Sequence, residues 1–91
     1  MTFEELFATI KSRKDSQAES SYTALLFQKG AAKISQKVGE EGTEVVVAAL
    51  AQSNERLIEE ISDLAYHVLV LMAYKGIEIE DILAELESRK R

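Results

Sequence analysis

The sequence has 91 residues, with 11 Lys and Arg against 16 Asp and Glu, and its formal net charge is −5. It has no Cys and a single His, which excludes disulfides, thiolate or multi-histidine metal sites and cysteine nucleophiles. The acidic balance argues against nucleic acid as the main partner, and the chain has neither a membrane-length apolar run nor a cleaved-signal pattern at its start.

The first element expected is a helix over residues 2–14. Thr2 and Glu5 have the spacing of a capping box, and apolar residues then recur at helical spacing. Residues 11–21 are polar and have no apolar period, so they predict a fading helix end followed by a loop.

A short helix is expected next, over residues 22–29, with Ser21 or Thr23 as its cap and Gly30 as its stop. Two long helices and a last amphipathic one follow, and their expected bounds are 31–51, 54–75 and 79–89, with Gly76 ending the second of the three. The sequence therefore predicts a single all-α domain over residues 1–91, an antiparallel bundle of four to five helices.

Two stretches, residues 45–51 and 64–73, are apolar around most of a helix circumference. A chain this short has little core in which to bury both. We expect self-association, with the bundle completed by dimerisation or a higher homo-oligomer. The alternative is a tight monomeric bundle in which these two helices are the innermost.

Acidic residues recur at i, i+3 on both long helices: Glu41 with Glu44, and Glu60 with Asp63. On an α-helix the first pair shares a face with Lys33, Lys37 and Glu40, and the second shares one with Arg56 and His67. An antiparallel return would let the two pairs face each other. Four clustered carboxylates repel unless a cation neutralises them, and oxygen ligands alone favour Mg²⁺ or Mn²⁺.

A solvated helix face explains acidic pairs as well, because glutamate is common on such faces. Gly39 and Gly42 lie inside the expected helix, where each costs about 1 kcal/mol relative to Ala. They permit close approach of a ligand or another backbone, or else they mark a kink or loose packing.

The segment 37–49, followed by 60–71, resembles the phosphoribosyl-ATP pyrophosphohydrolase family of histidine biosynthesis, one of the all-α, MazG-like nucleotide pyrophosphohydrolases. The shared pattern is Glu-x-x-Glu, a spacer and Glu-x-x-Asp, matched here by Glu41, Glu44, Glu60 and Asp63. The likeness runs from about residue 3 to 89 and includes residues 21–24 and 82–89. It departs at Gly42, where most relatives would have Ala.

The resemblance implies a stand-alone cytoplasmic enzyme that hydrolyses phosphoribosyl-ATP, a small-molecule nucleotide, between its α and β phosphorus atoms. Glu41, Glu44, Glu60 and Asp63 would hold Mg²⁺, with Mn²⁺ able to substitute, against the triphosphate oxygens. The residues that would take the proton of the attacking water are Glu40 and Glu41.

Basic and aromatic residues are the expected substrate contacts: Lys29, Lys33, Lys37, Tyr22 and His67. Each has a structural alternative. The lysines fit ordinary i, i+4 pairs, His67 fits a buried helix interface or a hydrogen bond to a metal-ligating carboxylate, and Tyr22 fits simple packing.

Two other functions compete with this interpretation. A MazG-like house-cleaning nucleoside triphosphate pyrophosphohydrolase would use the same four acids. A non-catalytic helical dimerisation module would leave the acidic groove merely solvated and would not depend on metal.

Overall fold

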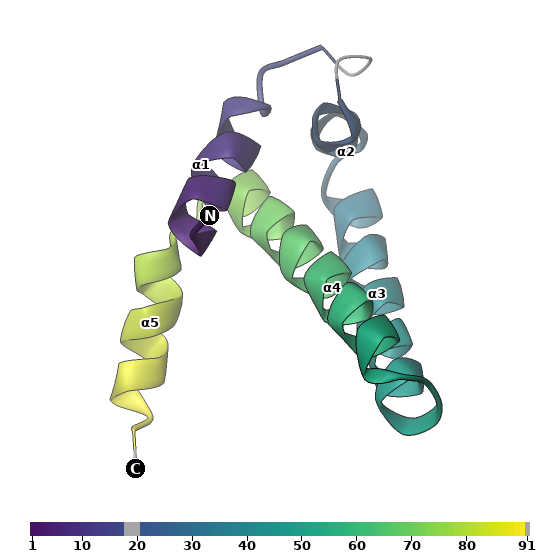
Figure 1. Ribbon diagram of the computed structural model, residues 1–91. Coiled ribbons are helices and arrows are strands. Elements are labelled where there is room, and N and C mark those ends of the chain that lie inside the picture. The colour runs from purple at the N-terminus through teal and green to yellow at the C-terminus, as the bar shows by residue number, and fades with distance from the viewer. Residues whose placement is uncertain (18–20, 91) are drawn as a thin grey trace.

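The computed structural model describes residues 1–17 and 21–90. It contains five helices: α1 (Phe3–Ser12), α2 (Tyr22–Lys29), α3 (Ala31–Ala51), α4 (Asn54–Lys75) and α5 (Ile79–Ser88) (Figure 1). No strand occurs within the described residues, so the all-α prediction is confirmed. None of the helices described is long and apolar enough to cross a membrane.

Helix bounds agree with the sequence prediction except at three ends. Helix α1 begins at Phe3 instead of residue 2, because Thr2 is its N-cap. The capping box is present, with the Thr2 N–H donating to Glu5 at 2.8 Å and the Glu5 N–H to the Thr2 hydroxyl at 3.0 Å. Helix α1 ends at Ser12 instead of near residue 14, because the N–H of Arg13 turns back to the Ile10 and Lys11 carbonyls. Helix α5 ends at Ser88, one residue early. The expected loop after α1 runs over residues 18–20, which lie outside the described residues.

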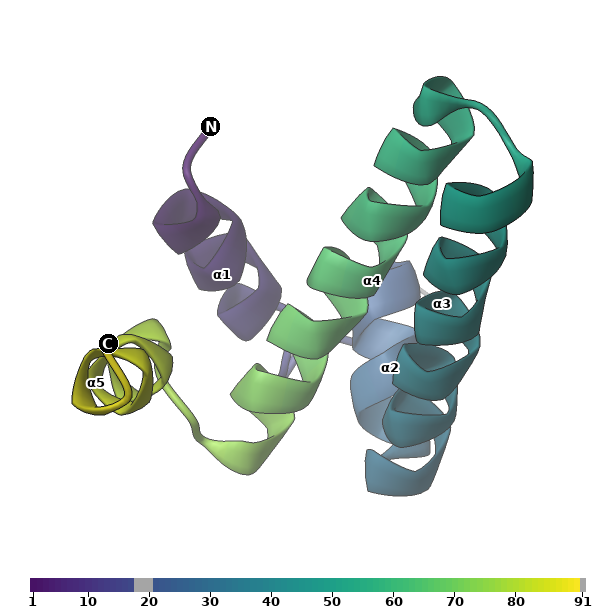
Figure 2. The same ribbon diagram turned by 90° about the horizontal axis from the view of Figure 1, so that it is seen from below.

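Helices α3 and α4 form an antiparallel pair, and they lie side by side in both views (Figure 2). Only Gln52 and Ser53 separate them, too few residues for anything but a direct return. Ser53 caps α4, its hydroxyl accepting from the Arg56 N–H at 3.2 Å. This short connection brings the two acidic pairs onto facing helices.

A single residue, Gly30, joins α2 to α3 with a φ of +91°, a backbone conformation that side-chain-bearing residues rarely adopt. A Cβ at this position would also lie 3.4 Å from the Tyr74 hydroxyl. The sharp turn lets α2 pack against both α3 and α4. As a result, Tyr22 at the start of α2 lies against His67 in the middle of α4.

The core occupies one end of the α3–α4 pair. Its buried side chains come from four helices and include Phe7, Ile10, Leu26, Phe27, Ile34, Leu69, Val70 and Met72. The apolar stretch 64–73 is therefore largely buried. In the stretch 45–51, however, Ala48 is buried while Val46, Val47 and Leu50 are exposed.

Helix α5 buries none of its residues and leaves Ile82, Leu83 and Leu86 exposed, and it lies apart from the α3–α4 pair in both views. One copy of the chain thus covers the apolar half of α4 and leaves uncovered the apolar faces of α5 and of the far end of α3.

Candidate functional site

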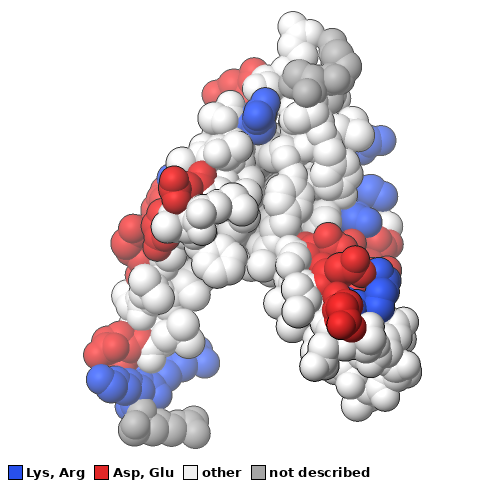
Figure 3. Space-filling model, viewed as in Figure 1, with Lys and Arg blue, Asp and Glu red and all other residues white. Residues whose placement is uncertain are grey.

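Three carboxylates meet where α3 and α4 face each other, and we call them the acidic cluster: Glu41 from α3, with Glu60 and Asp63 from α4. One oxygen from each lies within 4.8 Å of the others. Glu41 and Glu60 are only 7% and 5% exposed, whereas Asp63 is exposed. Figure 3 shows acidic side chains gathered over this helix pair with basic ones beside them. The packing therefore brings together residues 19 or more positions apart, as the two motifs predicted.

Each of the two buried glutamates has one oxygen in an ion pair and a second oxygen without a partner in the described part of the chain. The Lys37 ammonium lies 3.4 Å from Glu41 Oε1, and the Arg56 guanidinium lies 2.8 Å from Glu60 Oε1. The second oxygens, Glu41 Oε2 and Glu60 Oε2, are buried and have no hydrogen-bond partner among the described residues. Buried polar atoms almost always have a partner, and a cation could serve as the partner of these two oxygens.

The donor set fits a hard divalent ion, because it consists of carboxylate oxygens with neither thiolate nor imidazole among them. Asp63 is open to water, which leaves room for the water ligands that Mg²⁺ usually keeps. The chemistry of the site thus agrees with the metal preference expected from the sequence.

The fourth expected ligand, Glu44, lies at the edge of the acidic cluster. It is exposed, and it lines a hollow of about 260 Å³ together with Val47, Gln52, Arg56 and Glu60. The neighbouring Glu60 carboxyl raises the pKa of Glu44, because the protonated form of Glu44 can donate a hydrogen bond to it. Glu44 therefore faces the same space as the cluster without belonging to its tightest group.

Glu40 lies outside the acidic cluster, exposed on α3. Its carboxylate accepts a hydrogen bond from Gln36 at 2.8 Å and lies 3.4 Å from the Lys37 ammonium. These two contacts, the Gln36 bond first, lower the pKa of Glu40. The two proton acceptors expected from the sequence thus occupy different environments, one solvated and one buried in the cluster.

The pairing of Arg56 with a carboxylate of the acidic cluster was not predicted from the sequence. Its guanidinium contacts both Glu59 and Glu60, which raise its pKa. The i, i+4 spacing of Arg56 and Glu60 was the available signal, but the same spacing is common on solvated helices.

Tyr22 and His67 form a direct contact beside the cluster. The Tyr22 hydroxyl lies 2.9 Å from His67 Nε2, and His67 Nδ1 lies 2.7 Å from the backbone carbonyl of Asp63. His67 is 5% exposed and Tyr22 49%. The structure therefore places His67 against Tyr22 with both ring nitrogens engaged.

The other two lysines are less closely tied to the cluster. Lys33 is half-buried on α3, where its charge acts on Glu40, and Lys29 is exposed at the end of α2. Neither forms an ion pair with the described residues.

The two glycines of α3 have open space around them. A Cβ added at Gly39 or Gly42 would meet no atom of the described residues within 4 Å, and α3 continues unbroken through both. Close approach of another segment of this chain therefore does not explain them.

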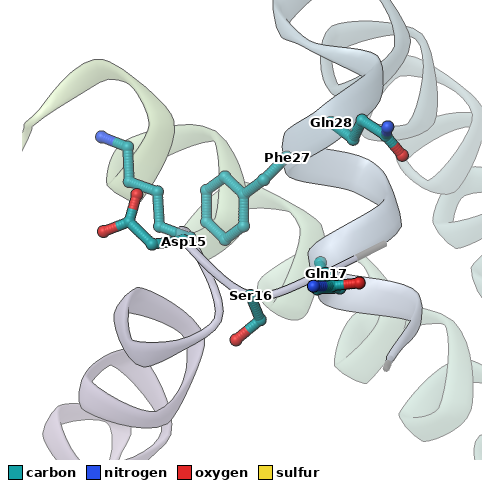
Figure 4. A pocket seen from close by; sticks show the side chains of 7 residues that line it. Asp15, Ser16, Gln17, Phe27 and Gln28 are labelled. Atoms are coloured by element: carbon teal, nitrogen blue, oxygen red, sulfur yellow. The ribbon is translucent and has the colours of Figure 1, made fainter. Parts of the chain in front are cut away.

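A second hollow, of about 390 Å³, lies between the end of α1 and α2, with the Phe27 ring pointing into it (Figure 4). It shares no residue with the acidic cluster; it is lined by Lys14, Asp15, Ser16, Gln17, Ala24, Phe27 and Gln28. We do not assign it to the chemistry of the cluster.

Comparison with known proteins gives consistent matches along the chain. The family model described as phosphoribosyl-ATP pyrophosphohydrolase matches residues 3–90. A phosphoribosyl-ATP pyrophosphatase of Listeria innocua is 57% identical over 86 residues, covering 94% of this chain and 82% of its own length. Proteins of the same name from Clostridium botulinum and Saccharolobus solfataricus are 52% and 47% identical over 87 and 88 residues. These matches cover 96% and 97% of this chain, and 79% and 94% of the two relatives.

Proposed function

Since the chain belongs to the phosphoribosyl-ATP pyrophosphohydrolase family, we propose that its acidic cluster carries out the reaction of that family. The chain is then a hydrolase of histidine biosynthesis that converts phosphoribosyl-ATP and water to phosphoribosyl-AMP and pyrophosphate. The observation that carries the proposal is the pair of buried, unpartnered oxygens of Glu41 and Glu60. A triphosphate substrate needs positive charge at this position, and these oxygens are suited to holding it.

Glu41, Glu60 and Asp63, with Glu44 at the edge, would hold Mg²⁺, and Mn²⁺ could replace it. The ion would offset charge on the triphosphate and lower the pKa of a bound water. The residues of the chain supply the rest: the carboxylates fix the position of the ion, and the helix pair α3–α4 fixes the carboxylates.

Phosphate oxygens would be met by lysines on α3. Lys37 has three N–H groups and shares its charge between Glu40 and Glu41, so it keeps donor capacity for a phosphate oxygen. Burial alone would lower the pKa of Lys37, but its interactions with Tyr22, Glu40 and Glu41 raise it above its usual value, and this keeps the ammonium charged. Lys33 and Lys29 extend the positive charge toward α2, where the far end of a triphosphate would lie.

Proton removal from the attacking water is assigned to Glu40 or Glu41. Glu40 is ionised at neutral pH, because its pKa is lowered, and it is open to solvent. Glu41 has a free oxygen inside the cluster. Because Glu41 is also a proposed metal ligand, Glu40→Gln is the variant that distinguishes them: turnover should be lost with the effect of Mg²⁺ on the Tm retained if Glu40 is the proton acceptor, and turnover should persist if Glu41 is.

The active form is proposed to be a homodimer or a higher homo-oligomer in the cytoplasm. A single copy leaves many apolar side chains exposed, among them Val46, Val47 and Leu50 on α3, Ile58 and Ile61 on α4, and Ile82, Leu83 and Leu86 on α5. A second copy would cover surface of this kind, which monomeric proteins rarely leave contiguous.

The test is pyrophosphate release from phosphoribosyl-ATP by the purified chain with Mg²⁺, compared with the same protein in chelator. We expect release only with the metal. Absence of release would contradict the proposal, and turnover of dCTP or dUTP in preference would favour the house-cleaning alternative. A non-catalytic dimerisation module would release pyrophosphate from none of them.

A further inference from the structure

The contact between Tyr22 and His67 has a fixed hydrogen-bond direction. His67 is the one histidine of the sequence, and it is buried in α4 with Nδ1 2.7 Å from the Asp63 carbonyl oxygen. A carbonyl oxygen only accepts hydrogen bonds, so Nδ1 carries a proton. In the neutral imidazole the other nitrogen, Nε2, is then an acceptor. The Tyr22 hydroxyl, 2.9 Å away, must donate to it.

Tyr22 consequently faces the site with lone pairs only. Its proton is directed inward to His67, and it makes no other hydrogen bond within the described residues. Burial raises the pKa of Tyr22, and this keeps the hydroxyl protonated even though the charge of Lys37 opposes the shift. The phenol oxygen is therefore a neutral acceptor at the rim of the acidic cluster.

The ring that carries this oxygen is held on two sides. Tyr66 stacks on Tyr22 with ring centroids 6.3 Å apart, and His67 meets it edge-on at 5.8 Å. Tyr66 is itself held by a hydrogen bond to Thr23. A side chain that is half exposed yet held in this way presents its oxygen in one direction.

We propose that Tyr22 accepts a hydrogen bond from a ribose hydroxyl of the substrate, and that His67 is a positioning residue that directs the Tyr22 proton away from the substrate. This inference rests on the proposed function and assigns one part of the substrate to one residue. Phosphate oxygens are acceptors at neutral pH, so they would meet lone pairs at Tyr22 and be repelled. The lysines of α3 offer the donors that phosphates need. The donors of a nucleotide substrate are its sugar hydroxyls and the exocyclic N–H of its base. The ribose is the part bonded directly to the phosphates, so its hydroxyls are the donors nearest to a phosphate chain held at the cluster.

The kinetic test uses phosphoribosyl-ATP analogues in which one ribose hydroxyl at a time is replaced by fluorine, which cannot donate a hydrogen bond. We expect one analogue to lose about tenfold in kcat/KM with the original protein, the size of one neutral hydrogen bond, mostly through KM. In Tyr22→Phe the kcat/KM for the natural substrate should fall by a similar factor. The kcat/KM of this variant for that analogue should be no lower than its value for the natural substrate. The matched control, Tyr66→Phe, should discriminate like the original protein, because it removes a hydroxyl from the same aromatic group.

A second variant tests the role of His67. His67→Phe removes the acceptor and frees the Tyr22 hydroxyl to rotate and to donate as well as accept, so discrimination against the same analogue should decrease while pyrophosphate is still released. A purely structural role would lower the turnover of all analogues in proportion. Equal losses for every analogue in Tyr22→Phe or His67→Phe would overturn the inference.

The hydrogen-bond direction can be read without substrate, because the sequence has one histidine. Nitrogen chemical shifts of ¹⁵N-histidine-labelled protein at pH 8 should show Nδ1 protonated and Nε2 unprotonated. Tyr22→Phe should shift Nε2 and leave Nδ1 protonated. An Nε2-protonated ring would overturn the inference whatever the kinetics. Lack of any turnover by the original protein would overturn the proposed function as well, whereas turnover without analogue discrimination would overturn the inference alone.

Discussion

Replacing Glu60 by Gln should stabilise the metal-free protein and abolish the effect of Mg²⁺. Glu60 Oε2 is buried without a donor, and a buried acceptor in that state costs about 1–3 kcal/mol. The amide of Glu60→Gln keeps an oxygen for Arg56 and turns an NH₂ group toward the carboxylates of Glu41 and Asp63, where it can donate.

The expected magnitude follows from two opposing terms. Loss of the Arg56–Glu60 ion pair, whose arginine is exposed, costs about 0.3–0.5 kcal/mol. The net gain is then about 0.5–2.7 kcal/mol, and each 1 kcal/mol shifts the Tm of a domain of this size by about 4–8 °C. In the original protein, Mg²⁺ at 100 times its Kd adds about 2.7 kcal/mol, a gain that the variant should lose.

The assay is thermal unfolding at a fixed protein concentration, in chelator and in Mg²⁺, with pyrophosphate release measured in parallel. Glu59→Gln is the matched control, since Glu59 is the adjacent residue, contacts the same arginine and is exposed. It should respond to Mg²⁺ like the original protein and retain turnover. The reasoning is refuted if Glu60→Gln unfolds at a lower temperature than the original protein in chelator, or if Mg²⁺ raises its Tm by an equal amount.

Other consequences can be measured with similar variants. Asp63→Asn should abolish pyrophosphate release while the helical circular dichroism spectrum persists; a turnover rate equal to that of the original protein would remove Asp63 from the site. Because Glu60 raises the pKa of Glu44, this carboxyl stabilises the metal-free fold below its unfolded pKa and ceases to do so as pH rises through the folded value; Mg²⁺ should therefore raise the Tm more at pH 8 than at pH 5, and an equal rise would contradict this. Gly39→Ala should stabilise the protein by about 1 kcal/mol, since the space around it is open, whereas Gly30→Ala should destabilise it by about as much because of its positive φ; loss of turnover in Gly39→Ala alone would indicate that a ligand approaches α3 there. Leu50→Lys should leave one copy folded and reduce the mass measured by light scattering, and an unchanged mass would exclude Leu50 from the interface between copies.

Helix bounds were predictable because local signals of different kinds coincided. At Gly30 and Gly76 a positive φ ends a helix, and at Ser21 and Ser53 a hydroxyl caps the helix that follows. The first helix begins one residue later than predicted, because Thr2 is its cap, and the helix ends near Ser12 and Ser88 differ from the prediction by two residues and one residue. Here the fraying polar segment gave no distinct stop.

The pairing of the two acidic motifs could also be predicted, because the short connection between α3 and α4 leaves one return direction. The burial of individual carboxylates could not. Glu41 and Asp63 belong to equivalent motifs, yet one is buried and the other exposed, because the depth of a side chain depends on how the helices rotate against each other. The same applies to His67, whose engagement by Tyr22 depends on where Gly30 directs α2.

The ion pairs of the site leave the proposed metal ligands free instead of filling the site. Lys37 pairs with Oε1 of Glu41 and Arg56 with Oε1 of Glu60, which fixes both carboxylates and leaves Oε2 of each buried without a partner among the described residues. A divalent ion bound to these Oε2 atoms would not need to break either ion pair, so little reorganisation would oppose its entry. Lys37 keeps donor capacity after serving Glu40 and Glu41, and it lies beside the cluster where a phosphate held by the ion would be. Lys37 and Arg56 have the spacing of ordinary helix ion pairs in the sequence, but in the proposed site they orient the metal-ligating carboxylates. Lys37 is placed so that it can contact a ligating carboxylate and a substrate phosphate at the same time.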